Sequence, residues 1–386
     1  MRRLIALTCA VILVDTIFFT ALTPLLPHYA HSLGLGKTGA GVLFAAYPAG
    51  CFVGAVPSGI AAGRLGAKTT VLLGVLAAAG CIFVFGLAGA AWQLDAARFV
   101  QGIASAFSWT GALVWLVSEA PLERRGSVIG AAFGAAAAGA LVGPLVGGIA
   151  SVAGTAATFV TLAVLSLAVA AWAAVTPAQQ PGELQPLAYL LRVLRHGDVV
   201  LAAWFTLLPG LLFGSLSVLA PLRLSDLGMG AVAISGVFLA AAAVETFSNT
   251  LLGRVADRRG PVVPLLWGLV ASIAVAALLP WPDGRALLAV LVVAAGPSFA
   301  AFFTPGMTLL TQVTEQRGLS LAYAFTLVSL AWAPGEAVGA AGAGALAGAT
   351  SDTLPYLILA AICAVTLAAL WRRRTSIVPV PSAGAA

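Results

Sequence analysis

The sequence contains very little charge. Only 8% of its 386 residues are Asp, Glu, Lys or Arg, and 61% are hydrophobic, whereas a soluble domain carries about 25% charged residues. Too few polar side chains remain to cover the surface of a soluble protein of this size. We therefore exclude a soluble enzyme, a nucleic-acid-binding protein and a disordered chain, and predict a membrane protein with several spans.

Cysteine and histidine are also scarce. The four cysteines all lie inside apolar runs, which favours small buried side chains over disulfides: Cys9, Cys51, Cys81 and Cys363. His28 and His31 have no neighbouring acid or thiol and make a poor metal site. Gly36-Lys37-Thr38 resembles the end of a phosphate-binding loop, but the first glycine of that motif is replaced by His31. We expect no cofactor, no metal and no direct use of ATP.

Long apolar runs dominate the chain. A helix needs roughly 20 apolar residues to cross a bilayer, and strands are excluded because these runs are too long and do not alternate. The twelve predicted spans are 4–27, 39–62, 69–91, 94–118, 127–150, 155–175, 198–222, 231–253, 262–280, 285–311, 320–346 and 353–371. The first run resembles a signal peptide, but it continues to about Leu26 without a small-residue cleavage site. The predicted fold class is an all-α membrane protein with twelve transmembrane helices.

The positions of the basic residues predict an orientation. With a cytoplasmic N-terminus, 15 of the 19 Lys and Arg residues fall in inside segments. Three fall outside, namely Lys37, Arg223 and Arg285, and Arg98 lies within a span. Cytoplasmic segments of membrane proteins are enriched in Lys and Arg. We therefore expect a multi-pass protein of the plasma (inner) membrane with both termini in the cytoplasm.

The chain reads as two halves. Its longest connection, 177–197, lies at the midpoint and separates six spans from six. Three glycine-rich or acidic patterns in the first half recur 192 to 196 positions later, which indicates duplication. We predict an N-terminal six-helix bundle (1–176), a cytoplasmic linker (177–197) with a short amphipathic helix at 187–194, a C-terminal six-helix bundle (198–372) and a cytoplasmic tail (373–386).

One repeated pattern falls between spans. Gly253-x3-Asp257-Arg258-x-Gly260 is predicted to be a loop joining the eighth and ninth spans, and its first-half copy begins at Gly59 and retains Arg64. An ion pair of Asp257 with Arg258 or a neighbour can hold two helices together in one conformation and open in another. The alternative is a solvated turn that carries positive charge. The first-half copy has Gly63 at the acidic position, so the corresponding ion pair between helices is weakened in the first half.

Two further patterns lie within spans. Arg98-Phe-Val-Gln101-Gly102 places a lone arginine in hydrocarbon, where it is costly without a partner; it either tunes proton binding or extends to the outer interface. Gly139-x3-Gly143-Pro144-x2-Gly147 predicts a flat groove for close helix packing, with a bend at Pro144. The alternative for this pattern is a packing seam without a role in transport.

Three carboxylates lie deep inside predicted spans: Asp15, Glu245 and Glu336. A low-dielectric environment disfavours the charged form of a carboxyl group, so such groups can exchange protons near neutral pH. Aromatic residues lie near them on the same helices, including Phe19 and Trp332, and a ring face attracts an organic cation. The alternative for each acid is a structural hydrogen bond to a neighbouring helix.

These patterns resemble those of a known family. The glycine-flanked Asp257-Arg258 pattern resembles the loop signature of the major facilitator superfamily. The arginine pattern is similar to one associated with proton transfer in proton-coupled members, and the glycine–proline pattern resembles the signature of the antiporter branches. Residues 13–27 of the first span resemble the first helix of drug:proton antiporters, including vesicular monoamine transporters. The chain departs from that branch at Ser329, where an acid is expected, and has no acid in its tenth span.

The resemblance implies two pseudo-symmetric six-helix bundles and a proton-coupled antiporter that exports small lipophilic, cationic compounds (multidrug efflux) by alternating access. A proton-coupled importer of a small nutrient, such as a sugar or an organic anion, is the alternative. We expect a monomer in the lipid bilayer whose partners are protons and a small molecule; a membrane-embedded enzyme or a pore is disfavoured. The proposed proton- and substrate-binding residues are Asp15, Glu245, Glu336, Arg98, Gln101, Trp332 and Asn249. The proposed gating residues are Gly59, Arg64, Gly253, Asp257, Arg258, Gly260, Gly139, Gly143, Pro144 and Gly147.

Overall fold

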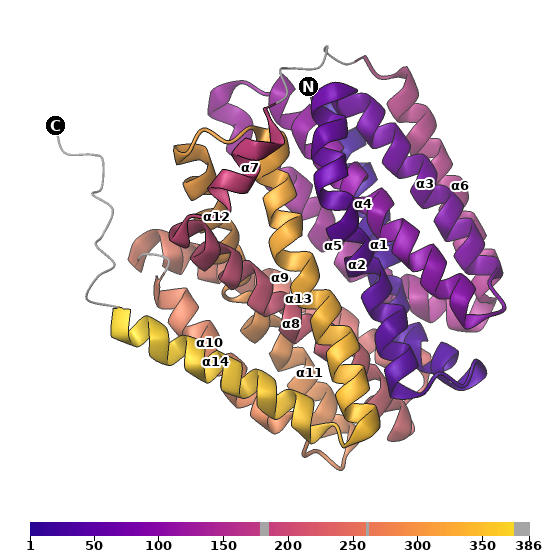
Figure 1. The fold of residues 1–386 in the computed structure, drawn as a ribbon. Helices are drawn as coiled ribbons and strands as arrows, with labels where there is room; N and C mark the ends of the chain where they lie inside the picture. Colours follow the sequence, from indigo (N-terminus) through magenta and orange to yellow (C-terminus); the bar gives the residue numbers. More distant parts are fainter. Residues whose placement is uncertain (178–184, 260–261, 374–386) are drawn as a thin grey trace.

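The computed structural model describes residues 1–177, 185–259 and 262–373, and every regular element in these ranges is a helix (Figure 1). The α-helices are α1 (Arg2–Ser32), α2 (Gly36–Arg64), α3 (Ala67–Leu87), α4 (Ala91–Glu119), α5 (Arg125–Ala153), α6 (Thr155–Val175), α7 (Leu187–Val193), α8 (Gly197–Asp226), α9 (Ala231–Arg259), α10 (Val262–Leu278), α11 (Arg285–Ala300), α12 (Phe303–Gln316), α13 (Leu321–Ala349) and α14 (Thr353–Arg373). A short 3-10 helix, η1 (Leu122–Arg124), precedes α5.

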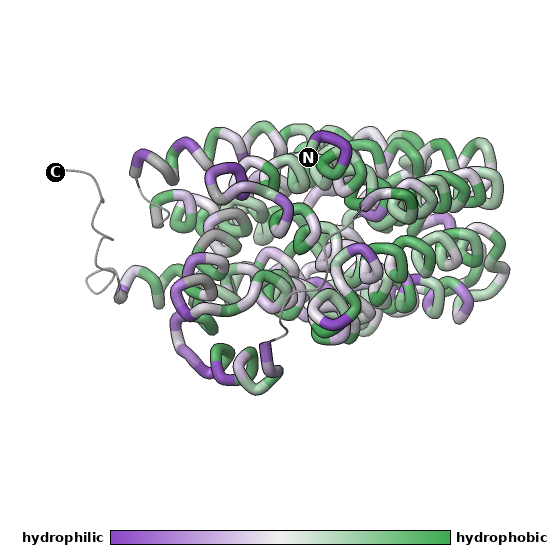
Figure 2. The backbone as a smooth tube through the Cα atoms, turned by 90° about the horizontal axis from the view of Figure 1, so that it is seen from above, coloured by the Kyte–Doolittle hydropathy of each residue, from purple (hydrophilic) through white to green (hydrophobic). Residues whose placement is uncertain are grey.

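The predicted fold class is confirmed. Eleven helical segments in the described part of the chain are long and apolar enough to cross a bilayer, with α11 and α12 counted as one segment; α10 is shorter, at 17 residues. Figure 2 shows hydrophobic residues along most of the backbone and hydrophilic residues gathered in few places. Large apolar side chains such as Val164 and Phe247 are exposed on the outside, where a bilayer provides the apolar surroundings that water does not.

The helices pack as two groups joined by a few helix pairs. In the first half α1 packs on α5, α4 packs on α2 and α3, and α3 packs on α6. In the second half α8 packs on α12 and α13, α9 packs on α11, and α10 packs on α14. The main contacts between halves are α2 with α13, α5 with α9, and α1 with α8. The two halves therefore face each other along α1, α2 and α5 of the first half and α8, α9 and α13 of the second.

The two ends of the bundles differ in charge. We call one end the basic side: α1 begins there and α2 ends there, and it carries Arg2, Arg3, Arg64 and Lys68. The opposite end, where α1 ends and α2 begins, is the far side. These names fix directions within the molecule only.

The glycine pattern in α5 forms the predicted packing seam. A side chain at Gly139 would meet the backbone of α1 at Leu13, one at Gly143 would meet Ile17, and one at Gly147 would meet Ala21. The absence of side chains therefore allows α5 to approach the backbone of α1, and α5 remains one continuous helix through Pro144.

Two predicted boundaries are wrong. The tenth span is not one helix, because a turn at Ala301–Phe302 separates α11 from α12, and Pro297 and Pro305 flank it; proline removes a helical hydrogen bond and disfavours an uninterrupted helix. The predicted loop from Gly253 is helical, because α9 continues through Arg259. Charged residues at the end of a spanning helix remain in water, so the helix can continue beyond the hydrocarbon boundary. Gly260 lies outside the described residues.

The linker helix and the cysteine prediction are confirmed. Residues Leu187–Val193 form α7, whose Leu190 and Val193 are buried in a cluster with Tyr323 and Leu327 of α13. All four cysteines are free, three of them buried and Cys9 half-buried.

Candidate functional site

A cavity of about 260 Å³ lies where the two halves meet. Its walls come from α1, α2, α4 and α5 of the first half and from α12 and α13 of the second. Most of the wall is apolar and aromatic, formed by Phe19, Phe133, Phe303, Phe325 and Trp332. Its lining runs from the middle of α1 and α2 toward the basic-side ends of α4, α5, α12 and α13.

Asp15 of α1 is the only acidic residue among the described residues that line this cavity. Its Oδ2 accepts hydrogen bonds from Ser105 Oγ (2.7 Å), Trp109 Nε1 (2.9 Å) and Tyr47 OH (3.4 Å). The side chain is buried, and its Oδ1 has no partner. Three donors on one oxygen stabilise the charged carboxylate, and all three donors line the same cavity.

Arg98 of α4 lies fully buried beside this site, with 0% of its surface exposed. Its Nη1 donates to Gln101 Oε1 (2.8 Å), and its guanidinium lies 5.0 Å from the ring centre of Tyr47 and 5.7 Å from those of Phe18 and Phe19. Such contacts with ring faces stabilise a cation. The alternative in which Arg98 extends to the outer interface is therefore wrong.

Glu336 brings a second carboxylate to the cluster from the other half. It lies on α13 with 2% of its surface exposed, and its Oε2 has no hydrogen-bond partner. It is close enough to Arg98 for charge attraction, as is Asp15. Gly210 and Gly214 of α8 meet the backbone around Glu336 and so allow α13 to pack closely there. We call Asp15, Arg98 and Glu336 the charge cluster.

Aromatic rings connect the halves next to the charge cluster. Phe19 stacks on Tyr47 with ring centres 4.6 Å apart, and it meets Trp332 of α13 edge-on at 6.1 Å. These rings pack with Cys51 and Ala333 in one small apolar cluster. Phe19 of the first half thus contacts both the Arg98 guanidinium and Trp332 of the second half.

Glu245 and Asn249 are not part of this arrangement. Both lie half-buried on α9, and the Cβ of Glu245 lies near Gly296 of α11. The structure therefore brings Asp15, Arg98, Gln101, Glu336 and Trp332 together, and it places Glu245 and Asn249 elsewhere.

The predicted gating residues fall in several places. Gly59 of α2 lies against Tyr323 and Thr326 of α13, so this glycine is at a contact between halves. Arg64 and Arg258 are exposed on the basic side, and Gly253 faces open space. The side chain of Asp257 lies outside the described part of the chain.

Three site residues are absent from the sequence-based expectation: Tyr47, Ser105 and Trp109. Ser105 and Trp109 follow Arg98 by seven and eleven positions, which places all three on one face of α4. That spacing could have identified Ser105 and Trp109 as site residues from the sequence. No sequence pattern identifies Tyr47, because its contact with Asp15 depends on how α2 packs against α1.

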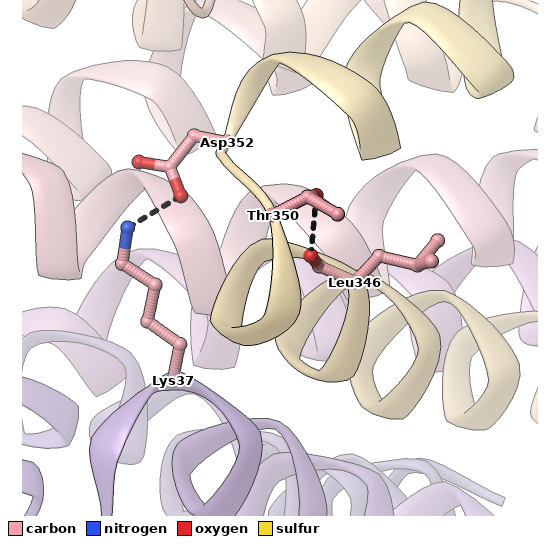
Figure 3. Close-up of polar contacts among 4 residues, drawn as sticks. All are labelled: Lys37, Leu346, Thr350 and Asp352. Atoms are coloured by element: carbon pink, nitrogen blue, oxygen red, sulfur yellow. Dashed lines mark hydrogen bonds and ion pairs between the residues drawn. The ribbon is translucent and has the colours of Figure 1, made fainter.

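The far side is held closed by contacts between α2 and α13. Side chains at Gly41 or Gly344 would meet the backbone of the opposite helix, at Ala340 and Lys37 respectively. Lys37 Nζ also forms an ion pair with Asp352 Oδ1 at 2.6 Å, which joins the start of α2 to the turn between α13 and α14 (Figure 3). No comparable seam joins α5 and α9 on the basic side within the described residues, since Gly126, Gly130 and Gly253 face open space.

Two groups of membrane-spanning helices, a cavity between them and buried charges at their contact define a polytopic membrane transporter. The sequence model of the Major Facilitator Superfamily matches residues 8–336, and the chain belongs to that family. No curated protein sequence matches the chain.

Solved structures share the fold at low sequence identity. A bacterial homologue of the human lysosomal transporter Spinster, in an inward-facing and unoccupied conformation, is 15% identical with a TM-score of 0.80 and 98% coverage of both chains. A D-xylose–proton symporter is 13% identical with a TM-score of 0.77, over 96% of this chain and 97% of the other. The nucleoside transporter NupG is 17% identical with a TM-score of 0.74, over 96% and 99%.

Proposed function

We propose that this transporter is a proton-coupled antiporter that exports small lipophilic cations by alternating access. The observation that carries the proposal is the charge cluster, in which two buried carboxylates from opposite halves lie within range of charge attraction from one buried arginine beside the cavity. Any change in how the halves meet changes the surroundings of Glu336 relative to Arg98. Protonation and conformation are then linked, which is what coupling requires.

The cavity favours one class of substrate. Its wall is mostly aromatic and aliphatic, and its acidic group is Asp15. An organic cation gains from ring faces and from the carboxylate, and its apolar body fills the remaining volume. A sugar needs many free hydrogen-bonding groups around it, whereas the polar groups of Tyr47, Ser105 and Trp109 in this wall already donate to Asp15.

The proposed cycle uses both carboxylates. With the cavity open to the basic side, a lipophilic cation binds against Asp15, and Glu336 releases its proton. The halves then rock so that the far-side contacts of α2 and α13 separate. On that side a proton returns to the carboxylates and displaces the cation. Arg98 compensates for whichever carboxylate is charged at each stage.

The remaining assignments follow from the sequence. The basic side is proposed to face the cytoplasm of a cell whose plasma membrane holds the protein, because Lys and Arg gather in cytoplasmic segments. Gly59, Arg64, Gly253 and Arg258 are proposed to act in basic-side gating, together with Asp257 and Gly260. Residues 1–176 and 198–372 are the proposed moving bodies, joined by 177–197. Glu245 remains a proposed proton site separate from the charge cluster, with Asn249 beside it, and the protein is proposed to act as a monomer.

Transport in proteoliposomes under an imposed pH gradient tests the proposal. With a panel of lipophilic cations, sugars, nucleosides and organic anions, we expect proton-driven counter-movement of the cations alone. Asp15→Asn and Glu336→Gln should each abolish proton-driven transport. Asp95→Asn, which neutralises an acid of α4 outside the cavity wall, serves as the matched control and should remain active.

Two outcomes would reject the proposal. Full proton-driven transport in both the Asp15→Asn and Glu336→Gln variants would remove the carboxylates from coupling. Accumulation of a sugar or an organic anion in the direction of proton flow would establish the importer alternative instead.

A further inference from the structure

A second and much smaller cavity lies inside the first half, on the other side of Asp15. Its volume is about 10 Å³, and its walls come from α1, α3, α4 and α6. Its polar lining residues are Asp15, Ser108 and Ser166, and valines and other apolar side chains complete it. Asp15 therefore lies between this cavity and the 260 Å³ cavity at the contact of the two halves.

Each of the three polar residues has a buried oxygen without a hydrogen-bond partner. These atoms are Asp15 Oδ1, Ser108 Oγ and Ser166 Oγ. All three residues are at least nine-tenths buried, with exposed fractions of 6%, 1% and 1%. Leaving a polar group unpaired in an apolar interior costs about 1–3 kcal/mol, so three such groups around one cavity require an explanation.

The two serines differ from other hydroxyl residues in these helices. Thr16 and Thr70 donate to the backbone carbonyl four positions earlier, and Ser118 donates to the one three positions earlier. This bond to a preceding carbonyl is the usual way for a helix to pair a buried hydroxyl. Ser108 and Ser166 do not make it, which leaves both hydroxyls available to a partner in the cavity.

We propose that this cavity binds one water molecule that bridges Asp15 Oδ1, Ser108 Oγ and Ser166 Oγ. The volume matches the roughly 10–15 Å³ needed for a single water, and buried waters make about three hydrogen bonds to groups that otherwise lack partners. The site joins α1, α4 and α6 through one small molecule. It does not depend on the proposed substrate or on the direction of transport.

The bridging water supports both protonation states of Asp15. Water and hydroxyl groups can each donate or accept a hydrogen bond. When Asp15 is charged, the water donates to Oδ1 and accepts from a serine. When Oδ1 carries a proton, the water accepts from it and donates to a serine. The three donors on Oδ2 stay in place in the charged state, so the water absorbs the change at Oδ1 without a rearrangement of the helices.

A structure of the whole protein in lipid nanodiscs, at a resolution that reveals ordered waters, tests the site directly. We expect one peak about 2.5–3.0 Å from each of the three oxygens. Ser108 and Ser166 hydroxyls turned toward the carbonyls of their own helices, with no peak between them, would overturn the proposal.

Difference infrared spectroscopy across a pH step provides a second readout. A water O–H band that shifts in heavy-oxygen water is expected in the unmodified protein and should be lost in the Ser108→Ala/Ser166→Ala double variant. Ser58→Ala is the matched control, because the Ser58 hydroxyl already has two partners in the same bundle, Ala55 O and Thr110 Oγ1. A band that persists in the double variant, or is absent from the unmodified protein, contradicts the site.

Discussion

The indole of Trp109 has two roles at one position. Its Nε1 donates to Asp15 at 2.9 Å, and its ring lies 5.8 Å from that of Phe133 in the wall of the cavity. A donor to a carboxylate contributes more than a donor to a neutral acceptor. The ring and the hydrogen bond can be separated by substitution, because phenylalanine retains an aromatic wall and lacks the donor.

We expect Trp109→Phe to weaken binding of a lipophilic cation by about tenfold or more, because loss of this donor destabilises the charged form of Asp15 and a hydrogen bond to a charged group contributes about 1.5–3 kcal/mol. Isothermal titration calorimetry at fixed pH, or the fluorescence of the ligand itself, measures this affinity. Trp115→Phe is the matched control on the same helix, because the buried Trp115 Nε1 has no partner. Equal affinities in the two variants would show that the indole donor is unimportant.

At this scale the sequence predicts charges better than it predicts their partners. Asp15, Arg98 and Glu336 were recognisable because a charge in a long apolar run is rare and costly. Ser105 shares one face of α4 with Arg98, but Tyr47 is an ordinary residue for a membrane helix, and only packing makes it a partner of Asp15. Glu245 matched the same rule as the other acids but lies on a helix that does not line the cavity.

At the scale of single elements, the contact of α1 with α5 depends on missing side chains. A Cβ on Gly143 would overlap Thr20 Oγ1 and approach Ile17 O at 2.8 Å. We expect Gly143→Val to force the two helices apart and to destabilise the protein by about 1–3 kcal/mol, the usual range for overpacking. The thermal unfolding midpoint in detergent should fall accordingly.

Gly134→Val is the control for this prediction. Gly134 lies on the same helix with open space around it. Gly134→Val therefore changes helix propensity as Gly143→Val does, but without a clash against α1. A similar fall in the unfolding midpoint for both variants would assign the effect to the backbone of α5 rather than to its seam with α1.

Glycine spacing is readable because it repeats every helical turn, and the seam was predicted for that reason. The turn between α11 and α12 was missed because a hydropathy window averages over it: residues 285–311 remain apolar whether or not the helix is continuous. The extension of α9 to Arg259 was missed because hydropathy locates the membrane boundary, and a helix need not end there.

At the scale of the whole molecule, duplication in the sequence predicts two halves, and the most extensive contact between helices, that of α2 with α13, crosses between them. Which helices meet across the division was not predictable. The pairing of α2 with α13 depends on small residues such as Gly41 and Gly344, whose partners lie about 300 positions away. Lys37 and Asp352 are equally remote in sequence, and the sequence did not predict that they pair.

The Lys37–Asp352 ion pair stabilises the closed far side. The two side chains are 31% and 15% exposed, and solvent screening limits such a pair to about 1 kcal/mol or less. That corresponds to at most about a fivefold change in the population with this side closed. Lys37→Glu places like charges together and should favour opening, whereas Lys37→Glu/Asp352→Lys restores attraction and should reverse the effect.

Disulfide trapping measures the closed population. Thr38 and Gly348 lie in contact beside the ion pair, because a Cβ on Gly348 would lie 2.7 Å from Thr38 Oγ1. With the four native cysteines replaced, we expect Thr38→Cys/Gly348→Cys to cross-link readily, to block transport when oxidised and to recover with reductant. Adding Lys37→Glu should slow cross-linking about two- to fivefold, within the range of a partly screened ion pair, and the charge swap should restore the rate. Transport that continues at full rate in the oxidised protein would show that the far side does not open between α2 and α13.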